Sequence, residues 1–378
     1  MVVRIDSFLR SRVMHSLGIL GCCLFAVHCA PRPVTAPAAT TLADATGSVV
    51  TPIVAVPKSA SLTAAIAPVA TPWDWKSFHG EQYDLGTVVV RSTLRDPMLR
   101  DRLLTFVPLM MEHYRTALVP LAAPREAPLL YIFGTRSEWM AYTRLRIPNE
   151  AATYEKIGRG GYTIEGESVL YDLGRFDTFT IAAHEGWHAY TQSNFEQPLP
   201  VWLEEGIACY MEGVRRTRGE EKLEFMPWRN FERYSELRDA HARKRLIPLE
   251  SLLADYPQTF LSDGRSALLT YYAQVWALVH FLNEGYDGKY HAGLVRAMSH
   301  ARDGKIAETL WASSRAGSNG ERRQMLARQL GPAVVREYFN PDLAEFTAEF
   351  NAYVEDLCAN GSWERVFRGD RPSRGLIK

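Results

Sequence analysis

The sequence has no excess of either charge. It contains 43 Lys and Arg residues against 43 Asp and Glu residues, so its formal net charge at pH 7 is zero. Proteins that follow a nucleic-acid backbone need a surplus of basic side chains, usually gathered on one face. Here the two signs are mixed along most of the chain, which argues against a nucleic acid as the main partner.

The N-terminus has no apolar run long enough to span a membrane. Its run LGILGCCLFAV, at residues 17–27, has about a dozen residues, whereas a membrane-spanning helix needs about 20. Arg4, Arg10 and Arg12 precede this run, and basic residues followed by a short apolar core are typical of a signal peptide. We therefore expect export from a bacterial cytoplasm to the cell envelope.

Cysteine is scarce, and three of the five cysteines lie in or just after this apolar run. A bacterial lipoprotein signal ends in small residues followed by the cysteine that is lipidated, and residues 1–29 resemble one. ILGC, which ends at Cys22, has the better local pattern, and AVHC, which ends at Cys29, follows the better length of apolar run. Either cysteine can be the anchor. Only Cys209 and Cys358 would remain, as a disulfide or as two thiols.

A segment without aromatic residues follows the predicted signal. Residues 30–72 consist mostly of Ala, Pro, Thr and Val. Such a stretch cannot bury enough apolar surface to offset the entropy lost on ordering. We predict a flexible tether that holds a folded domain away from a membrane surface, with order beginning near Trp73.

The pattern after Trp73 predicts an α+β fold, with a small mixed sheet and helices at residues 73–250 and a mainly helical part at 251–378. Strands are expected at 83–94 and 127–134, and a hairpin at 161–173 that turns at Glu165 and Gly166. Helices are expected at 97–118, which Pro97 begins, and at 137–145, with Ser137 as its possible cap. A further helix, capped by Asp177, is expected after the hairpin. Later helices are expected at 266–283, 321–330 and 342–357.

The helix that follows Asp177 carries the segment AAHEGWHAY. His184 and His188 lie four residues apart, so on a helix they share one face and can bind one metal ion. Glu185 lies about 100° around the helix from His184, where it can reach a water molecule instead of the metal. Gly186 costs a helix interior up to ~1 kcal/mol relative to Ala, which predicts tight packing against a neighbouring helix.

A hydrolytic zinc site needs a third protein ligand. The segment LPVWLEEGIACYMEG begins a second helix near Pro200 and offers the carboxylates of Glu204, Glu205 and Glu212. Helical geometry turns Glu204 away from the face that Glu205 and Glu212 share. Spacing alone does not choose among the three.

The two helices together resemble the gluzincin metallopeptidases, which include thermolysin-like enzymes and zinc aminopeptidases. In that family the glutamate before the glycine of a W-L-x-E-G-x-A helix is the third zinc ligand, and in WLEEGIA this residue is Glu205. The resemblance covers roughly residues 83–282. It implies a catalytic domain of the thermolysin or aminopeptidase type and one zinc ion held by His184, His188 and Glu205. Glu185 would then be the general base for attack of a metal-activated water on a peptide bond.

The family pattern also assigns residues beyond the two helices. Many aminopeptidase-type gluzincins have a tyrosine on a later helix that hydrogen-bonds the oxyanion. In YYAQVWALVHFL, Tyr272 falls on that position and Tyr271 is the alternative. The segment GRGGYTIEG, at residues 158–166, is either the edge strand that holds the substrate backbone or an ordinary hairpin. The G-x-M-E-N signature of aminopeptidases is missing, which leaves endopeptidase action open.

The expected function is therefore that of an exported zinc metallopeptidase, joined to a membrane surface by a lipid anchor and acting on a peptide or protein substrate. The alternative is a catalytically inactive surface lipoprotein with a gluzincin-like fold, which acts as a binding or structural module.

Overall fold

The computed structural model describes residues 68–155, 159–174, 177–216, 223–261, 265–313 and 330–371. The predicted signal, most of the predicted tether and nearly all of the helix expected at 321–330 lie outside these residues. No helix in the described part of the chain is long and apolar enough to cross a membrane. The α+β class expected from the sequence is confirmed, with a small mixed sheet and many helices.

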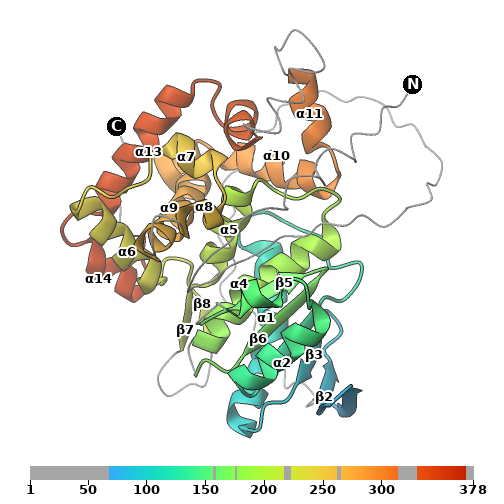
Figure 1. Ribbon diagram of the computed structural model, residues 1–378. Helices are drawn as coiled ribbons and strands as arrows, with labels where there is room; N and C mark the ends of the chain where they lie inside the picture. Colours follow the sequence, from blue (N-terminus) through green and yellow to red (C-terminus); the bar gives the residue numbers. More distant parts are fainter. Residues whose placement is uncertain are drawn as a thin grey trace, which may run out of the picture.

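The main sheet has the strand order β1-β2-β3-β4-β6-β5 in the described residues. Figure 1 shows this sheet in the lower part of the view, where β2, β3, β5 and β6 are labelled. Its strands are β1 Ala70–Trp75, β2 Phe78–Asp84, β3 Val89–Ser92, β4 Leu129–Phe133, β5 Gly161–Ile164 and β6 Glu167–Tyr171. The first three form an antiparallel meander, and β3, β4 and β6 run parallel. Strand β5 pairs antiparallel with β6 and so forms an edge of the sheet.

Turn chemistry decides where the strands end. The single strand expected at 83–94 is wrong, because the chain reverses between β2 and β3. The turn contains Gly86 at φ 78°, and the N–H of Gly86 donates to the Asp84 carboxylate at 2.9 Å. The hairpin expected at 161–173 is confirmed, since Glu165 and Gly166 between β5 and β6 both have positive φ. Positive φ in adjacent residues is the geometry of a tight hairpin turn.

Helices cover both faces of this sheet. They are α1 Pro97–Thr116, α2 Arg136–Arg146, α3 Ala151–Tyr154 and α4 Asp177–Asn194. Alternate residues of β4 point to opposite faces. Leu130 and Ile132 belong to the large apolar core that α1 and α4 share, whereas Tyr131 and Phe133 join an aromatic cluster with Trp139 of α2. This layering puts α4 against the sheet next to β5 and β6.

The helix boundaries correct two predicted caps. Pro97 begins α1 as expected, and Asp96 is its cap. The cap of α2 is Thr135 rather than Ser137, because Thr135 and Glu138 form a reciprocal capping box. Asp177 is the first residue of α4 instead of its cap.

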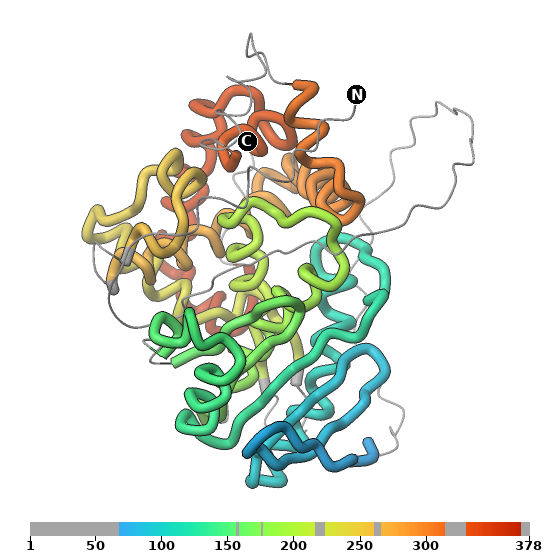
Figure 2. The backbone as a smooth tube through the Cα atoms, turned by 45° about the vertical axis from the view of Figure 1, so that its right-hand side comes forward, coloured from blue at the N-terminus to red at the C-terminus, as the bar shows by residue number. Residues whose placement is uncertain are grey.

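The rest of the described chain is mainly helical. Its helices are α5 Val201–Met211, α6 Phe231–Ala242, α7 Leu249–Ala254, α8 Pro257–Leu261, α9 Arg265–Glu284, η1 Gly285–Gly288, α10 His291–Arg302, α11 Ile306–Ser313, α13 Leu343–Leu357 and α14 Ser362–Arg368, and residues 330–338 are helical as well. Figure 2 shows these helices gathered beside the sheet part. Helix α9 contacts α5, α6, α8, α10 and α13, and is the centre of this half. A short hairpin of β7 Val214–Arg216 and β8 Leu223–Phe225 interrupts the helices.

A half-buried histidine gives the fold a pH-dependent element. His113 of α1 stacks on Phe225 of β8, with ring centroids 4.2 Å apart, and its Nε2 has no hydrogen-bond partner among the described residues. Burial lowers the pKa of His113 from 6.5 to about 3. The unfolded chain therefore takes up this proton near pH 6.5 while the folded chain does not, so stability falls as the pH decreases through this window.

We expect His113→Phe to keep the stacking and to remove this loss of stability. Urea unfolding of both proteins at about pH 7 and about pH 4 measures the effect. The free energy of unfolding of the variant should rise relative to that of the unchanged protein as the pH falls. A difference in unfolding free energy that is the same at both pH values would contradict the assignment.

Candidate metal centre

Glycine lets the two motif helices pack closely against their neighbours. A Cβ on Gly186 of α4 would lie 2.6 Å from Cε of Met110 and 2.7 Å from the Tyr114 hydroxyl, both on α1. The tight packing expected at Gly186 is thus present. A Cβ on Gly206 of α5 would lie 2.6 Å from the backbone oxygen of Val275 on α9. These contacts fix α4 against α1, and α5 against α9.

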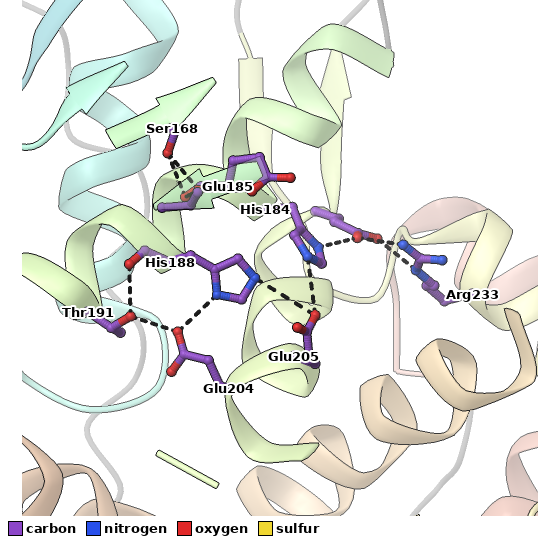
Figure 3. Close-up of polar contacts among 10 residues, drawn as sticks. Ser168, His184, Glu185, His188, Thr191, Glu204, Glu205 and Arg233 are labelled. Carbon is purple, nitrogen blue, oxygen red and sulfur yellow. Dashed lines mark hydrogen bonds and ion pairs between the residues drawn. The ribbon is translucent and has the colours of Figure 1, made fainter. Parts of the chain in front are cut away.

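Three side chains from α4 and α5 converge in the core (Figure 3). Nε2 of His184 lies 3.5 Å from Oε2 of Glu205, and Nε2 of His188 lies 3.8 Å from the same oxygen. One donor atom from each residue lies within 4.8 Å of the other two, which is close enough for all three to hold one metal ion. Of the three glutamates that the sequence left open, Glu205 is the one that faces both Nε2 atoms.

Glu212 supports His184 from the opposite side of the ring. Its Oε1 lies 2.7 Å from Nδ1 of His184, and Arg233 of α6 donates to both of its carboxylate oxygens, at 2.8 and 3.1 Å. Asn230 donates to Oε2 at 2.6 Å. Burial tends to raise the pKa of Glu212, but Arg233 and His184 outweigh it and lower the pKa to about 2.

Glu212 is therefore an anion whose oxygens are already occupied. An anionic acceptor at Nδ1 favours the tautomer of His184 that leaves the Nε2 lone pair for a metal. A second group of His184, Cys209 and Glu212 also lies within metal-binding distance. The contacts of Glu212 with Arg233 and Asn230 make that group the poorer metal site.

Glu204 does the same for the second histidine. Its Oε1 lies 3.0 Å from Nδ1 of His188, and the Thr191 hydroxyl donates to this oxygen at 2.7 Å (Figure 3). Glu204 is thus turned away from the Glu205 face, as helical geometry predicts, and towards α4. Each imidazole has its own carboxylate partner, an arrangement that orients the ring and raises its basicity as a ligand.

The charges of the site favour a cation. Burial tends to lower the pKa of both imidazoles, but Glu205 and Glu212 around His184, and Glu204 and Glu205 around His188, outweigh it and raise each pKa. A metal ion would replace the protons that this negative environment attracts. Oε2 of Glu205 accepts no hydrogen bond from the described residues. The donor set of two imidazole nitrogens and one carboxylate oxygen is one that fits zinc in catalytic sites.

Glu185 lies beside this group without joining it. Its Oε2 accepts a hydrogen bond from the Thr163 hydroxyl of β5 at 2.9 Å, and its Oε1 has no hydrogen-bond partner in the described part of the chain. Burial raises the pKa of Glu185 to about 8. A carboxyl group whose pKa lies near neutrality can both accept and return a proton.

The two tyrosines predicted as alternatives both border the centre from α9. The ring of Tyr272 lies 6.3 Å from that of His184, and the Arg233 guanidinium lies 5.1 Å from the Tyr272 ring. Tyr271 stacks on Phe260, and its hydroxyl has no hydrogen-bond partner among the described residues. Burial, and after it the charge of Glu205, raises the pKa of Tyr271.

The structure adds residues that sequence reasoning missed. Thr163 contacts Glu185, and Arg233 and Asn230 contact Glu212. Thr163 belongs to the segment 158–166 that was expected as an edge strand or a hairpin, but its contact with Glu185 was not expected, and Asn230 and Arg233 belong to no motif. Cys209 and Cys358 are thiols, the second of the two states expected for them.

The centre thus combines a three-residue donor set, a carboxylate partner for each imidazole and a carboxyl group with an unbonded oxygen. A hydrolytic metal site can be built from these groups. No family model matches the sequence, and no curated protein matches it.

Proposed function

We propose that this chain is a zinc-dependent metallopeptidase of the gluzincin type, with His184, His188 and Glu205 as the zinc ligands. The observation that carries the proposal is the convergence of two Nε2 atoms and one carboxylate oxygen from the HExxH helix and the WLEEGIA helix. Glu204 and Glu212 support it, because each contacts Nδ1 of one imidazole and leaves Nε2 of that ring for a metal.

The reaction proposed is hydrolysis of a peptide bond. Zinc, when bound, supplies a Lewis acid that polarises the scissile carbonyl and makes water more acidic. Glu185 accepts the proton of the attacking water on Oε1 and passes it to the leaving amine. A tyrosine hydroxyl of α9 donates a hydrogen bond to the oxyanion, with Tyr272 the first choice and Tyr271 the alternative.

The sheet edge next to Glu185 suits a peptide substrate. Strand β5 pairs only with β6 among the described strands, so its outer backbone groups face no sheet neighbour there. An extended peptide can add to such an edge as a further strand. The order of sheet, α4, α5 and a helical half also supports the thermolysin-like type of catalytic domain, and the N-terminal sequence supports export with a lipid anchor on Cys22 or Cys29.

The test is cleavage of a mixture of unstructured peptides by the purified protein. We expect cleavage products, loss of cleavage after treatment with a chelator, and recovery when zinc is added back. Recovery follows if the side chains of His184, His188 and Glu205 remain arranged for the metal. Cleavage that persists unchanged after complete metal removal would contradict the proposal.

One observation favours the alternative, a binding or structural module without activity. The side chains of His184, Glu185, His188 and Glu205 are all at most 1% exposed. A site that solvent does not reach suits a metal that only stabilises the fold, because a catalytic zinc must exchange water or substrate at one coordination position. Zinc that raises the melting temperature of the protein without any peptide cleavage would establish this alternative.

A further inference from the structure

The hairpin of β5 and β6 contacts the backbone and the side chain of Glu185. Thr163 and Ser168 are directly opposite in the hairpin register, and both are buried. The Ser168 hydroxyl donates to the backbone oxygen of Glu185 at 2.8 Å (Figure 3). The Thr163 hydroxyl lies 2.9 Å from Oε2 of Glu185 and 3.0 Å from the same backbone oxygen. Two hydroxyls of one hairpin therefore bind one helical residue.

Each hydroxyl has a single proton, which limits the possible bonds. The Ser168 hydroxyl donates its proton to the backbone oxygen of Glu185, its nearest acceptor here. The Thr163 hydroxyl has three acceptors within reach: Oε2 of Glu185 at 2.9 Å, the backbone oxygen of Glu185 at 3.0 Å and the Ser168 hydroxyl at 3.1 Å. It donates to Oε2, which is the nearest of them and the one that can carry charge. Oε1 accepts no hydrogen bond from the described residues. One oxygen of the carboxylate is held and the other is left available.

A glutamate side chain rotates about several bonds, so a general base needs a partner that fixes its carboxylate. Thr163 is suited to this because its β-branched side chain has few rotamers and sits on a paired strand. The neighbouring bond between Ser168 and the backbone of Glu185 holds the helix and the hairpin in register. The carboxylate is thereby positioned by the sheet instead of by its own helix.

We propose that Thr163 is a positioning residue of the centre, whose hydroxyl holds Oε2 of Glu185 so that Oε1 can accept the proton of the attacking water. The inference rests on the proposed function, because it concerns the orientation of the proposed general base. It also means that the strand proposed to receive the substrate is the strand that orients the base.

Two substitutions at Thr163 test the role of the hydroxyl. Thr163→Val keeps the shape without the hydroxyl, and we expect kcat to fall about 10- to 100-fold while KM stays within about twofold. Thr163→Ser restores the hydroxyl and should return kcat to within about threefold of the unchanged protein. A fall in kcat that is equally large in both variants, or a change in KM alone, would overturn the inference.

The matched control removes a buried threonine hydroxyl that contacts the same hairpin on its other face. Thr143 of α2 donates to the backbone oxygen of Trp139 at 2.8 Å and lies 3.1 Å from the hydroxyl of Tyr162, the residue before Thr163 on β5. It touches the strand on the face away from α4 and does not contact Glu185. Thr143→Val should lower the melting temperature about as much as Thr163→Val and leave kcat unchanged. If both Val variants lower kcat equally, the effect comes from general loss of structure and the inference fails.

A structural readout does not depend on activity. In crystal structures, the Glu185 carboxylate should occupy one position in the unchanged protein and in Thr163→Ser, and should move in Thr163→Val, with equal zinc content in all three. If the unchanged protein cleaves no peptide but the carboxylate moves as expected, the proposed function fails and the contact of Thr163 stands. If it cleaves peptides and the carboxylate stays in place in Thr163→Val, only this inference fails.

Discussion

Glu185→Gln is expected to bind zinc as the unchanged protein does and to hydrolyse peptides about 100- to 10,000-fold more slowly. The substitution replaces one carboxylate oxygen with an amide group of nearly the same size. Glutamine can still accept the hydrogen bond of the Thr163 hydroxyl, which the carboxylate accepts at 2.9 Å. It cannot accept a proton from water, so only the general base is removed.

Zinc binding should survive because Glu185 lies outside the donor set of His184, His188 and Glu205. The folded state should survive because burial raises the pKa of Glu185 to about 8, so a neutral side chain fits this environment. The measurement combines elemental analysis for zinc with the cleavage rate on a peptide substrate. Full activity of Glu185→Gln would contradict the mechanism, and loss of its zinc would contradict the assignment of the ligands.

The second large effect concerns the three glutamates of α5 and its C-terminal end. We expect Glu205→Gln to lose zinc almost completely, because it removes the charged ligand that faces both Nε2 atoms. Glu204→Gln should weaken zinc binding only about 10- to 100-fold, because it changes a partner of the ligand and not the ligand itself. This order of zinc affinities follows from geometry, since Glu204 contacts Nδ1 of His188 at 3.0 Å and not the Nε2 that faces the metal site.

Glu212→Gln should differ from Glu205→Gln in zinc affinity and from Glu204→Gln in folding stability. It also changes the partner of a ligand, so zinc binding should weaken about 10- to 100-fold. In addition it leaves the buried Arg233 guanidinium without its ionised partner, which costs about 3–5 kcal/mol of folding free energy. Glu204→Gln is the matched control, because its carboxylate has no arginine partner in the described contacts.

Competition with a coloured chelator measures the zinc affinities, and urea unfolding of the metal-free proteins measures the stabilities. The expected pattern is one variant with zinc lost, one with zinc weakened, and one with zinc weakened and the fold destabilised. Equal zinc affinities for the Gln variants of Glu204, Glu205 and Glu212 would contradict the division of roles among them.

The motif residues were predictable because an α-helix has a fixed geometry. Their separation in the sequence therefore determines which of them share a face within α4 and within α5. The pair His184 and His188 needs only a helix to share one face. The turn at Glu165 and Gly166 was predictable from its residues, and both have the positive φ that such a turn requires. The packing at Gly186 was predictable because glycine in a helix interior needs a compensating contact.

Other features depend on contacts between segments that are distant in the sequence. Thr163 is 22 residues from Glu185, and Arg233 is 21 residues from Glu212. No local pattern indicates either pair, because the pairings exist only after β5 and α6 have packed against the motif helices. The reversal between β2 and β3 was missed for a different reason: the apolar residues around Gly86 continue the strand pattern through the turn.

The choice among the glutamates shows where sequence reasoning ends. Helical geometry places Glu205 and Glu212 on one face, and both indeed contact His184. It does not say which imidazole nitrogen each of them meets, because that depends on the crossing of α4 and α5. Arg233 separates their roles, since a carboxylate that is bound by a guanidinium has fewer electron pairs for a metal.

The most direct test of the central claim is the zinc content of the purified protein, measured by elemental analysis beside a variant with His184 and His188 both replaced by glutamine. We expect about one zinc ion per chain in the unchanged protein and none in the variant. Two results would contradict the claim that these helices form a zinc centre. One is equal zinc content in the two proteins, and the other is an unchanged protein that binds no zinc after dialysis against a zinc solution.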